Sequence, residues 1–217
     1  MPDRRLEDWG WDDGWAALFA AHADVEPARV ISQDRDRWTV RAAAGVYPAR
    51  LPSARRVEPY PGVGDWVLVR PGPSPADPLS LVGVLPRRSR FVRGAAGEAG
   101  GEQTVAANVD RVWIVHGLDV PPNARKLERY LALAWESGAI PEVLLTKADL
   151  CPDVDGAVAA VEDVAFGVTV RVVSVMDGTI VDALAESLEP GRTVALLGPS
   201  GVGKSSLVNR LAESEVA

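Results

Sequence analysis

The order of apolar and polar residues divides the chain into two regions of different secondary structure. Up to about residue 93, short apolar runs alternate with polar residues between Gly and Pro, as in "DRWTVRAAAGVYP" and "GDWVLVRPGP". Successive side chains of a strand point to opposite faces, so this pattern is typical of half-buried antiparallel strands. We therefore predict a small β-barrel, preferably the five-stranded OB type, with an SH3-like barrel as the alternative.

A short helix is predicted ahead of the barrel, in "DDGWAALFAAH". Asp12 or Asp13 is a suitable N-terminal cap, because an Asp side chain accepts hydrogen bonds from the free N–H groups of the first turn. Helical spacing places Trp15, Leu18 and Phe19 on one face, which is expected to pack on the barrel.

After residue 104 the pattern changes to continuous apolar runs separated by helical periodicity. The runs are "RVWIVHG", "EVLLTKAD", "VTVRVVSV" and "TVALLG", and the helical stretches are "ARKLERYLALAWESG", "VDGAVAAVEDVAF" and "GTIVDALAESL". Continuous apolar strands are typical of parallel sheets buried on both faces. We predict three parts: a helix and barrel over 1–93, a Gly-rich linker over 94–104, and an α/β domain over 105–217.

Composition narrows the class of protein. The 217 residues are 47% hydrophobic and include one Cys and two His, which excludes a disulfide framework and gives no zinc ligand set. No apolar run approaches the roughly 20 residues that span a bilayer. We expect a globular cytoplasmic protein with no membrane partner.

Charge is distributed unevenly along the chain. The formal net charge is −7, yet the stretch from Arg50 to Arg93 contains eight Arg and only three acidic residues. Because exposed charges are screened over about 8–10 Å, a local basic surface can hold RNA phosphates whatever the total charge. The alternative interpretation is an ordinary solvated charged face.

The strongest motif is "GPSGVGKS", which follows an apolar strand and opens a helix. It fits the G-x-x-x-x-G-K-[ST] phosphate loop, in which backbone N–H groups and a Lys hold phosphates and a hydroxyl binds Mg²⁺. We predict Lys204 and Ser205 as catalytic, with Ser205 on Mg²⁺. The predicted phosphate-binding residues are Gly198, Pro199, Ser200, Gly201, Val202, Gly203, Lys204, Ser205 and Ser206.

A second motif, "TKAD", ends another predicted strand and suggests which base is bound. The Asp149 carboxylate can accept two hydrogen bonds from guanine, whereas adenine offers no such donor pair. Lys147 can lay its stem along the base. A backbone amide at Ser174, after the next strand, can meet the base carbonyl. The predicted base-binding residues are Thr146, Lys147, Ala148, Asp149 and Ser174.

The order of these motifs is circularly permuted, because the base-reading motif precedes the phosphate loop. With "GDWV", "LPRRSRFVRG", "VAANVDRVWIV", "PPNARKLERYLALAWESGAIPEVLLTKADL" and "GPSGVGKSSLVN", the chain resembles the ribosome small-subunit-dependent GTPase A (RsgA) family. That family has an OB barrel, a circularly permuted GTPase domain and a C-terminal zinc domain. One position departs from the family pattern, since Thr146 stands where Asn is usual.

The resemblance implies a GTPase that binds GTP or GDP with Mg²⁺ and acts in late maturation of the 30S ribosomal subunit. It implies 30S and 16S rRNA as partners, stimulation of hydrolysis by the ribosome, a monomer, and no DNA or membrane partner. An arginine cluster at the barrel exit is expected to face rRNA: Arg87, Arg88, Arg90 and Arg93. Zinc is expected only in a C-terminal domain that this sequence lacks.

Twelve residues follow Ser205, and they include no switch Thr, no DxxG element and no Cys-rich segment. We therefore expect a truncated chain, with an incomplete α/β domain, that hydrolyses GTP poorly. The group that orients the attacking water is not identified. Two alternatives remain: a P-loop kinase of guanylate-kinase type, and a non-catalytic RNA-binding scaffold.

Overall fold

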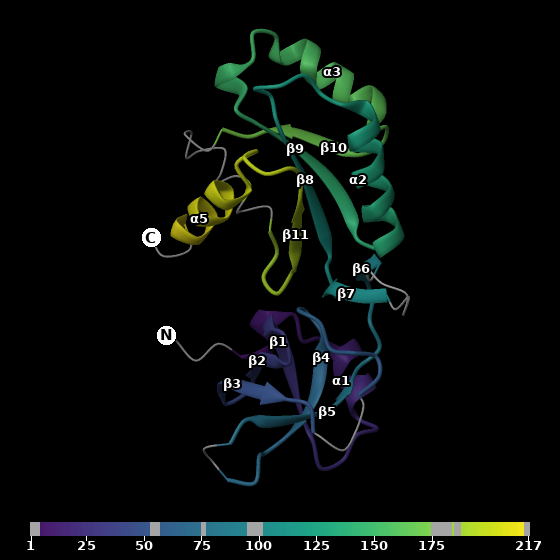
Figure 1. The fold of residues 1–217 in the computed structure, drawn as a ribbon, viewed down its shortest axis with the longest axis vertical. Coiled ribbons are helices and arrows are strands. Elements are labelled where there is room, and N and C mark those ends of the chain that lie inside the picture. Colours follow the sequence, from purple (N-terminus) through teal and green to yellow (C-terminus); the bar gives the residue numbers. More distant parts are fainter. Residues whose placement is uncertain are drawn as a thin grey trace. The chain divides into compact units, whose positions relative to one another are not determined.

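The computed structural model describes residues 5–52, 57–74, 77–94, 102–174, 184 and 188–214. These residues form two compact units. The first contains residues up to Val109 together with Pro190–Thr193, and the second contains Asp110–Glu189 and the residues from Val194 onward. Figure 1 labels the elements of both units.

The first unit is built on a closed five-stranded barrel, in the order β1-β2-β3-β5-β4. Its strands are β1 Glu26–Asp34, β2 Arg37–Ala42, β3 Gly45–Arg50, β4 Trp66–Arg70 and β5 Leu79–Val84. All neighbours are antiparallel except β3 and β5. The interior is filled by inward-facing apolar residues, among them Val30, Trp38, Val40 and Leu81. The predicted OB-like barrel is confirmed.

A short 3-10 helix, η1 (Leu6–Trp9), and helix α1 (Asp13–Phe19) precede the barrel. Asp12 caps α1 by accepting from the backbone N–H of Trp15 at 3.0 Å, as predicted. Trp15 is buried against Trp66 and Leu85, and Phe19 packs on the same cluster. Leu18 was predicted on this face but is exposed, so the buried stripe of this short helix is narrower than expected.

Strands β6 (Arg90–Gly94) and β7 (Glu102–Ala107) pair as an antiparallel hairpin. Gly94 and residues 102–104, at the two ends of the predicted linker, therefore lie in strands. The rest of that linker is outside the described residues.

Two arginines of the predicted RNA-facing cluster have partners inside the first unit. Arg87, with a side chain 9% exposed, forms a two-point ion pair with the fully buried Asp65, at 2.7 and 2.8 Å. Arg88 forms a two-point pair with Asp12, both bonds 2.6 Å, and lies over the Trp15 ring. The prediction that Arg87 faces rRNA is wrong, and Arg88 is already neutralised by a carboxylate.

The second unit contains a four-stranded parallel sheet, in the order β10-β9-β8-β11. The strands are β8 Arg111–Gly117, β9 Ile140–Thr146, β10 Thr169–Val172 and β11 Val194–Leu197. The inner strands β8 and β9 are almost wholly buried, as their apolar runs predicted. Strand β10 alternates between exposed and half-buried residues because it lies at an edge of the sheet.

Helices pack on both faces of this sheet (Figure 1). Helices α2 (Ala124–Ser137) and α3 (Val154–Val164) cover one face, where Leu127 lies near Ile114 and Val143. Helix α5 (Lys204–Ser214) packs on the other, where Leu207 joins a core with Trp113 and Leu144. The predicted helix "GTIVDALAESL" falls mostly outside the described residues. None of the described helices has both the length and the apolar character needed to cross a membrane.

Candidate nucleotide-binding site

Both sequence motifs lie at the carboxyl edge of the parallel sheet. "TKAD" follows β9, the phosphate loop follows β11, and β8 lies between these two strands. Since all strands are parallel, their carboxyl ends meet along one edge, where open α/β sheets bind ligands. The fold thus brings together two segments separated by about fifty residues of sequence.

The glycines of the phosphate loop have the backbone conformations that the loop requires. Gly201 and Gly203 have φ of 81° and 95°, in the left-handed region where an L side chain is strained. A Cβ on Gly198 would lie 2.3 Å from the carbonyl oxygen of Val115, so the loop crosses β8 with backbone against backbone. Beside Gly201 the space is open, which leaves room for a phosphate group.

Lys204 is the first residue of α5, and its side chain folds back over the loop. The ammonium donates to the carbonyls of Gly198 and Pro199, at 2.8 and 2.6 Å. An ammonium has three donors, so one remains for a phosphate oxygen. Lys204 is therefore placed to add positive charge beside the N-terminus of α5, which itself favours anions.

Ser205 and Ser206, in the first turn of α5, are exposed. Within the described ranges no three His, Cys, Asp or Glu side chains come together as a metal cluster. The role of Ser205 as an Mg²⁺ ligand remains a prediction.

Thr146 connects the two motifs. Its side chain is buried, and its hydroxyl donates to the carbonyl of Val202 in the phosphate loop at 2.6 Å. The carbonyl of His116 is a second, longer acceptor at 3.3 Å. Thr146, which replaces the usual Asn, thus uses its hydroxyl to hold the phosphate loop against the base motif. Contact between Thr146 and the base remains a prediction.

Asp149 lies in the 3-10 turn η2 (Ala148–Leu150), and its carboxylate is exposed. Contact between the Asp149 carboxylate and guanine remains a prediction. Lys147 has φ of 58°, and its ammonium donates to Asp119 at 2.7 Å. The hydrogen bond from Lys147 holds the pKa of Asp119 below its ordinary value. Asp119 was missed from the sequence because it belongs to no motif.

Ser174 lies two residues beyond the end of β10. The backbone N–H of Val173 donates to the carbonyl of Leu145 at 2.7 Å, which keeps this segment beside β9. Residues 175–183 are outside the described part of the chain. The predicted contact between the Ser174 amide and the base remains a prediction.

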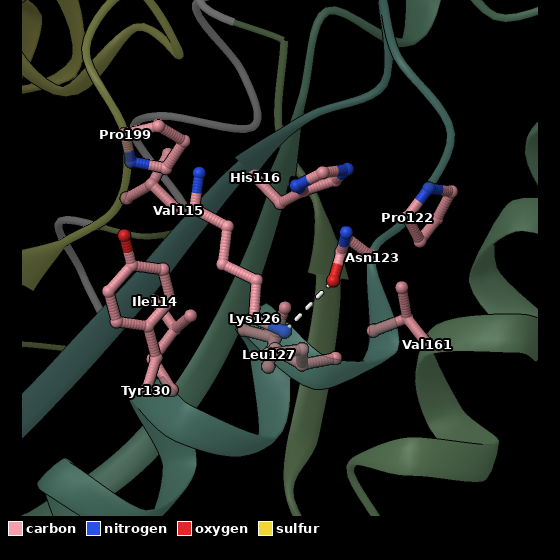
Figure 2. Close-up of a pocket in the computed structure, with 11 residues that line it drawn as sticks. Ile114, Val115, His116, Pro122, Asn123, Lys126, Leu127, Tyr130, Val161 and Pro199 are labelled. Atoms are coloured by element: carbon pink, nitrogen blue, oxygen red, sulfur yellow. Dashed lines mark hydrogen bonds between the residues drawn. The ribbon is translucent and has the colours of Figure 1, made fainter.

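A small hollow borders the phosphate loop through Pro199 (Figure 2). It is lined by apolar side chains and by His116, Asn123 and Lys126, and Figure 2 shows the Lys126 side chain extending from α2 toward Pro199. Burial lowers the pKa of His116, so the ring stays neutral at physiological pH. None of residues 146–149 lines this hollow, which makes it a neighbour of the candidate site.

Comparison with curated proteins agrees with this geometry. A relative from Opitutus terrae, named "Small ribosomal subunit biogenesis GTPase RsgA", is 43% identical over 220 residues, or 95% of this chain and 60% of the relative. A relative of the same name from Streptomyces coelicolor is 43% identical over 213 residues, or 95% of this chain and 57% of the relative. The chain therefore spans somewhat more than half the length of these relatives.

Two solved structures share the fold. The crystal structure of YjeQ from Thermotoga maritima matches 86% of this chain and 65% of its own, with a TM-score of 0.67 and 24% identity. The crystal structure of YloQ, described as a circularly permuted GTPase, matches 87% and 64%, with a TM-score of 0.64 and 23% identity. The family model "RsgA GTPase" matches residues 84–217. The chain belongs to the RsgA GTPase family.

Proposed function

We propose that this chain binds guanine nucleotides as part of a GTPase that acts in biogenesis of the small ribosomal subunit. The barrel, predicted over residues 1–93, contacts ribosomal RNA, and the α/β region, predicted over 105–217, binds the nucleotide. The names of the curated relatives support both the activity and the process. We further propose that the protein works as a cytoplasmic monomer.

The observation that carries the proposal is the hydrogen bond from Thr146 to Val202. It joins the segment that reads the base to the loop that binds phosphate, so a single nucleotide can occupy both. A phosphate loop alone fits many nucleotides. A phosphate loop fixed beside an exposed Asp149 fits guanine in particular, because that carboxylate matches the ring N–H and the exocyclic amine.

The base preference is tested by equilibrium binding of GDP, ADP and xanthosine diphosphate to this chain and to Asp149→Asn. We expect GDP to bind at least about tenfold more tightly than ADP, a difference of about 1.4 kcal/mol. Asp149→Asn replaces an acceptor with a donor and shifts the preference toward the xanthine nucleotide. Asp155→Asn, at an exposed position of α3, is the matched control and leaves the preference unchanged.

Equal affinity for GDP and ADP, unchanged by Asp149→Asn, contradicts the guanine site. Phosphorylation of an added nucleoside monophosphate then favours the kinase alternative. Salt-dependent RNA binding that ignores the nucleotide favours the scaffold alternative.

In phosphate-loop GTPases, hydrolysis is accelerated mainly by electrostatic stabilisation of the transferring phosphoryl group and by correct positioning of the reacting groups. Lys204 and the loop N–H groups stabilise negative charge on the transferring phosphoryl group, which is the main source of catalysis in such reactions. When bound at Ser205, Mg²⁺ neutralises charge on the phosphate oxygens. Loss of Lys204, as in Lys204→Ala, is expected to reduce both nucleotide affinity and turnover.

For the ribosomal partner we propose the exposed arginines at one end of the β2–β3 ladder as contacts to 16S rRNA. Trp38 pairs with Ala49, so the adjacent Arg37 and Arg50 lie at the same end of these strands, and both are exposed. This replaces Arg87, whose guanidinium is held inside the barrel unit. Phosphates on RNA are bound mainly through such charges.

Co-sedimentation with purified 30S subunits tests this surface. The double variant Arg37→Glu/Arg50→Glu is expected to lose binding at moderate salt, and the remaining binding should depend less on salt concentration. Arg125→Glu, on the exposed side of α2, is the control. If both variants bind 30S subunits like the unaltered chain, the β2–β3 surface is not the contact.

A further inference from the structure

Lys147 is held by a carboxylate that comes from a different strand connection. It follows β9 in the left-handed conformation, with φ of 58° and ψ of 38°, and its ammonium donates to Asp119 Oδ2 at 2.7 Å. Asp119 follows β8. Both side chains are about one-third exposed, at 31% and 33%, so the pair lies at the surface of the site.

The two segments are fixed to each other by backbone as well as by this ion pair. Gly117 pairs with Thr146 in the β8–β9 register, and the N–H of Leu118 donates to the carbonyl of Thr146 at 2.8 Å. Asp119 therefore lies two residues beyond the end of β8, next to a backbone segment that is hydrogen-bonded to β9.

Gly117 provides the space in which the pair forms. A Cβ there would lie 2.5 Å from Asp119 Oδ1 and 3.4 Å from Cδ of Lys147. The Lys147 stem and the Asp119 carboxylate thus both pass close over the bare backbone of Gly117. This arrangement determines the direction of the Lys147 stem.

We propose that Asp119 is a positioning residue for guanine nucleotides, which holds the Lys147 ammonium so that the aliphatic stem forms one wall of the base site. This inference rests on the proposed function. A free Lys side chain has many rotamers, and ordering it on binding costs affinity. A stem that is already ordered by Asp119 avoids that cost.

The charge of Asp119 makes the direction of the change in GDP affinity diagnostic for this proposal. Both Asp119 and the diphosphate of GDP are negatively charged. Removal of the Asp119 carboxylate should therefore by itself strengthen GDP binding. If Asp119 has no positioning role, Asp119→Asn is therefore expected to bind GDP as tightly as the unaltered chain or more tightly. An Asp119 that positions Lys147 predicts weaker GDP binding.

The experiment measures the affinity of the chain for GDP and for inorganic pyrophosphate. The Asp119→Asn variant is expected to bind GDP about two- to fivefold more weakly, the range for a surface ion pair. Its affinity for pyrophosphate, which has no base, should not decrease. Asp119→Glu should recover part of the loss, and Asp155→Asn is the control for removal of an exposed charge.

A double-mutant cycle with Lys147→Gln completes the test. In that background Asp119→Asn should cause no further loss of GDP affinity, because the group that it positions is gone. GDP binding that is unchanged or tighter in Asp119→Asn overturns the inference, as does an equal loss for pyrophosphate or an undiminished loss in the Lys147→Gln background. Failure of the proposed function is distinguishable, since the unaltered chain would then bind ADP as well as GDP.

Discussion

In the barrel unit, two of the four clustered arginines that stand out in the sequence, Arg87 and Arg88, are bound by carboxylates of the same unit. In the α/β unit, the Asp149 carboxylate and the Ser205 hydroxyl, which stand out equally, are exposed at the sheet edge. Arg87 and Asp65 show the first case and are almost fully buried. The comparison teaches that a cluster of like charges in the sequence does not by itself locate a free charged surface, because folding can pair these charges with carboxylates of the same unit.

The largest expected effect comes from Asp65→Asn in the barrel. The variant leaves the buried Arg87 without its counter-charge, and breaking a buried ion pair typically costs about 3–5 kcal/mol. Urea unfolding should show this loss in the barrel transition, whereas the exposed control Asp34→Asn should stay within about 0.5 kcal/mol. A loss of stability in Asp65→Asn no larger than that of the control would mean that the Arg87–Asp65 pair contributes little to the stability of the barrel.

The next effect is expected for Thr146→Val in the α/β unit. Valine keeps the shape but leaves the Val202 carbonyl without its donor, which costs about 1–3 kcal/mol at a buried site. Calorimetry should show weaker binding of both GDP and pyrophosphate with an unchanged ratio of GDP to ADP affinity. Thr146→Ser restores the hydroxyl and should restore binding. A changed base preference in Thr146→Val would instead indicate direct contact with the base.

A smaller effect is expected for Arg88→Gln. The pair with Asp12 is half-exposed, so we expect less than about 1 kcal/mol, part of it from the cation–π contact with Trp15. The Arg88 guanidinium lowers the pKa of Asp12 from 3.8 to about 2. The stabilisation is therefore complete above pH 3.8 and is lost as the pH falls through 2. Unfolding curves of Arg88→Gln should lack this acid-dependent part, and an identical pH profile would contradict the assignment.

The smallest effect concerns His116, beside the hollow near the phosphate loop. Burial lowers its folded pKa below 6.5, against weaker opposing influences from Val120 and Asp119, while the Lys126 charge acts in the same direction as burial. The unfolded chain therefore takes up the proton first as the pH falls below 6.5, and stability declines from there toward the folded pKa. His116→Gln should flatten the profile in this window. An unchanged dependence of stability on pH in His116→Gln would show that burial does not disfavour protonation of the His116 ring.

Periodicity predicted most of the fold. Strand β8 matches its predicted run from Arg111 to Gly117, and Asp12 caps α1 as expected. The errors have local causes. Leu18 is exposed because α1 has only seven residues, and β10 is not buried on both faces because it lies at the sheet edge.

The candidate site was predictable only where a motif marks it. The spacing of "GPSGVGKS" identified the loop, whereas the inward bond of Thr146 depends on a partner 56 residues away. Asp119 was not predictable, because its pairing with Lys147 arises from the β8–β9 register rather than from local sequence. Arg87 was misassigned because sequence does not show that Asp65 is buried opposite it.

The parallel pairing of β11 with β8 has a consequence for synthesis of the chain on the ribosome. The segment proposed to read the base ends at Asp149, and the phosphate-loop motif is completed at Ser206, about 57 residues later. At about 5–20 residues per second, the nascent chain presents one half of the site for several seconds before the other exists. Strand β11 then has to enter at β8, beside a sheet that β8, β9 and β10 can already form. The nucleotide capture proposed above therefore has to follow the docking of β11, and a bound nucleotide would favour the docked form of that strand.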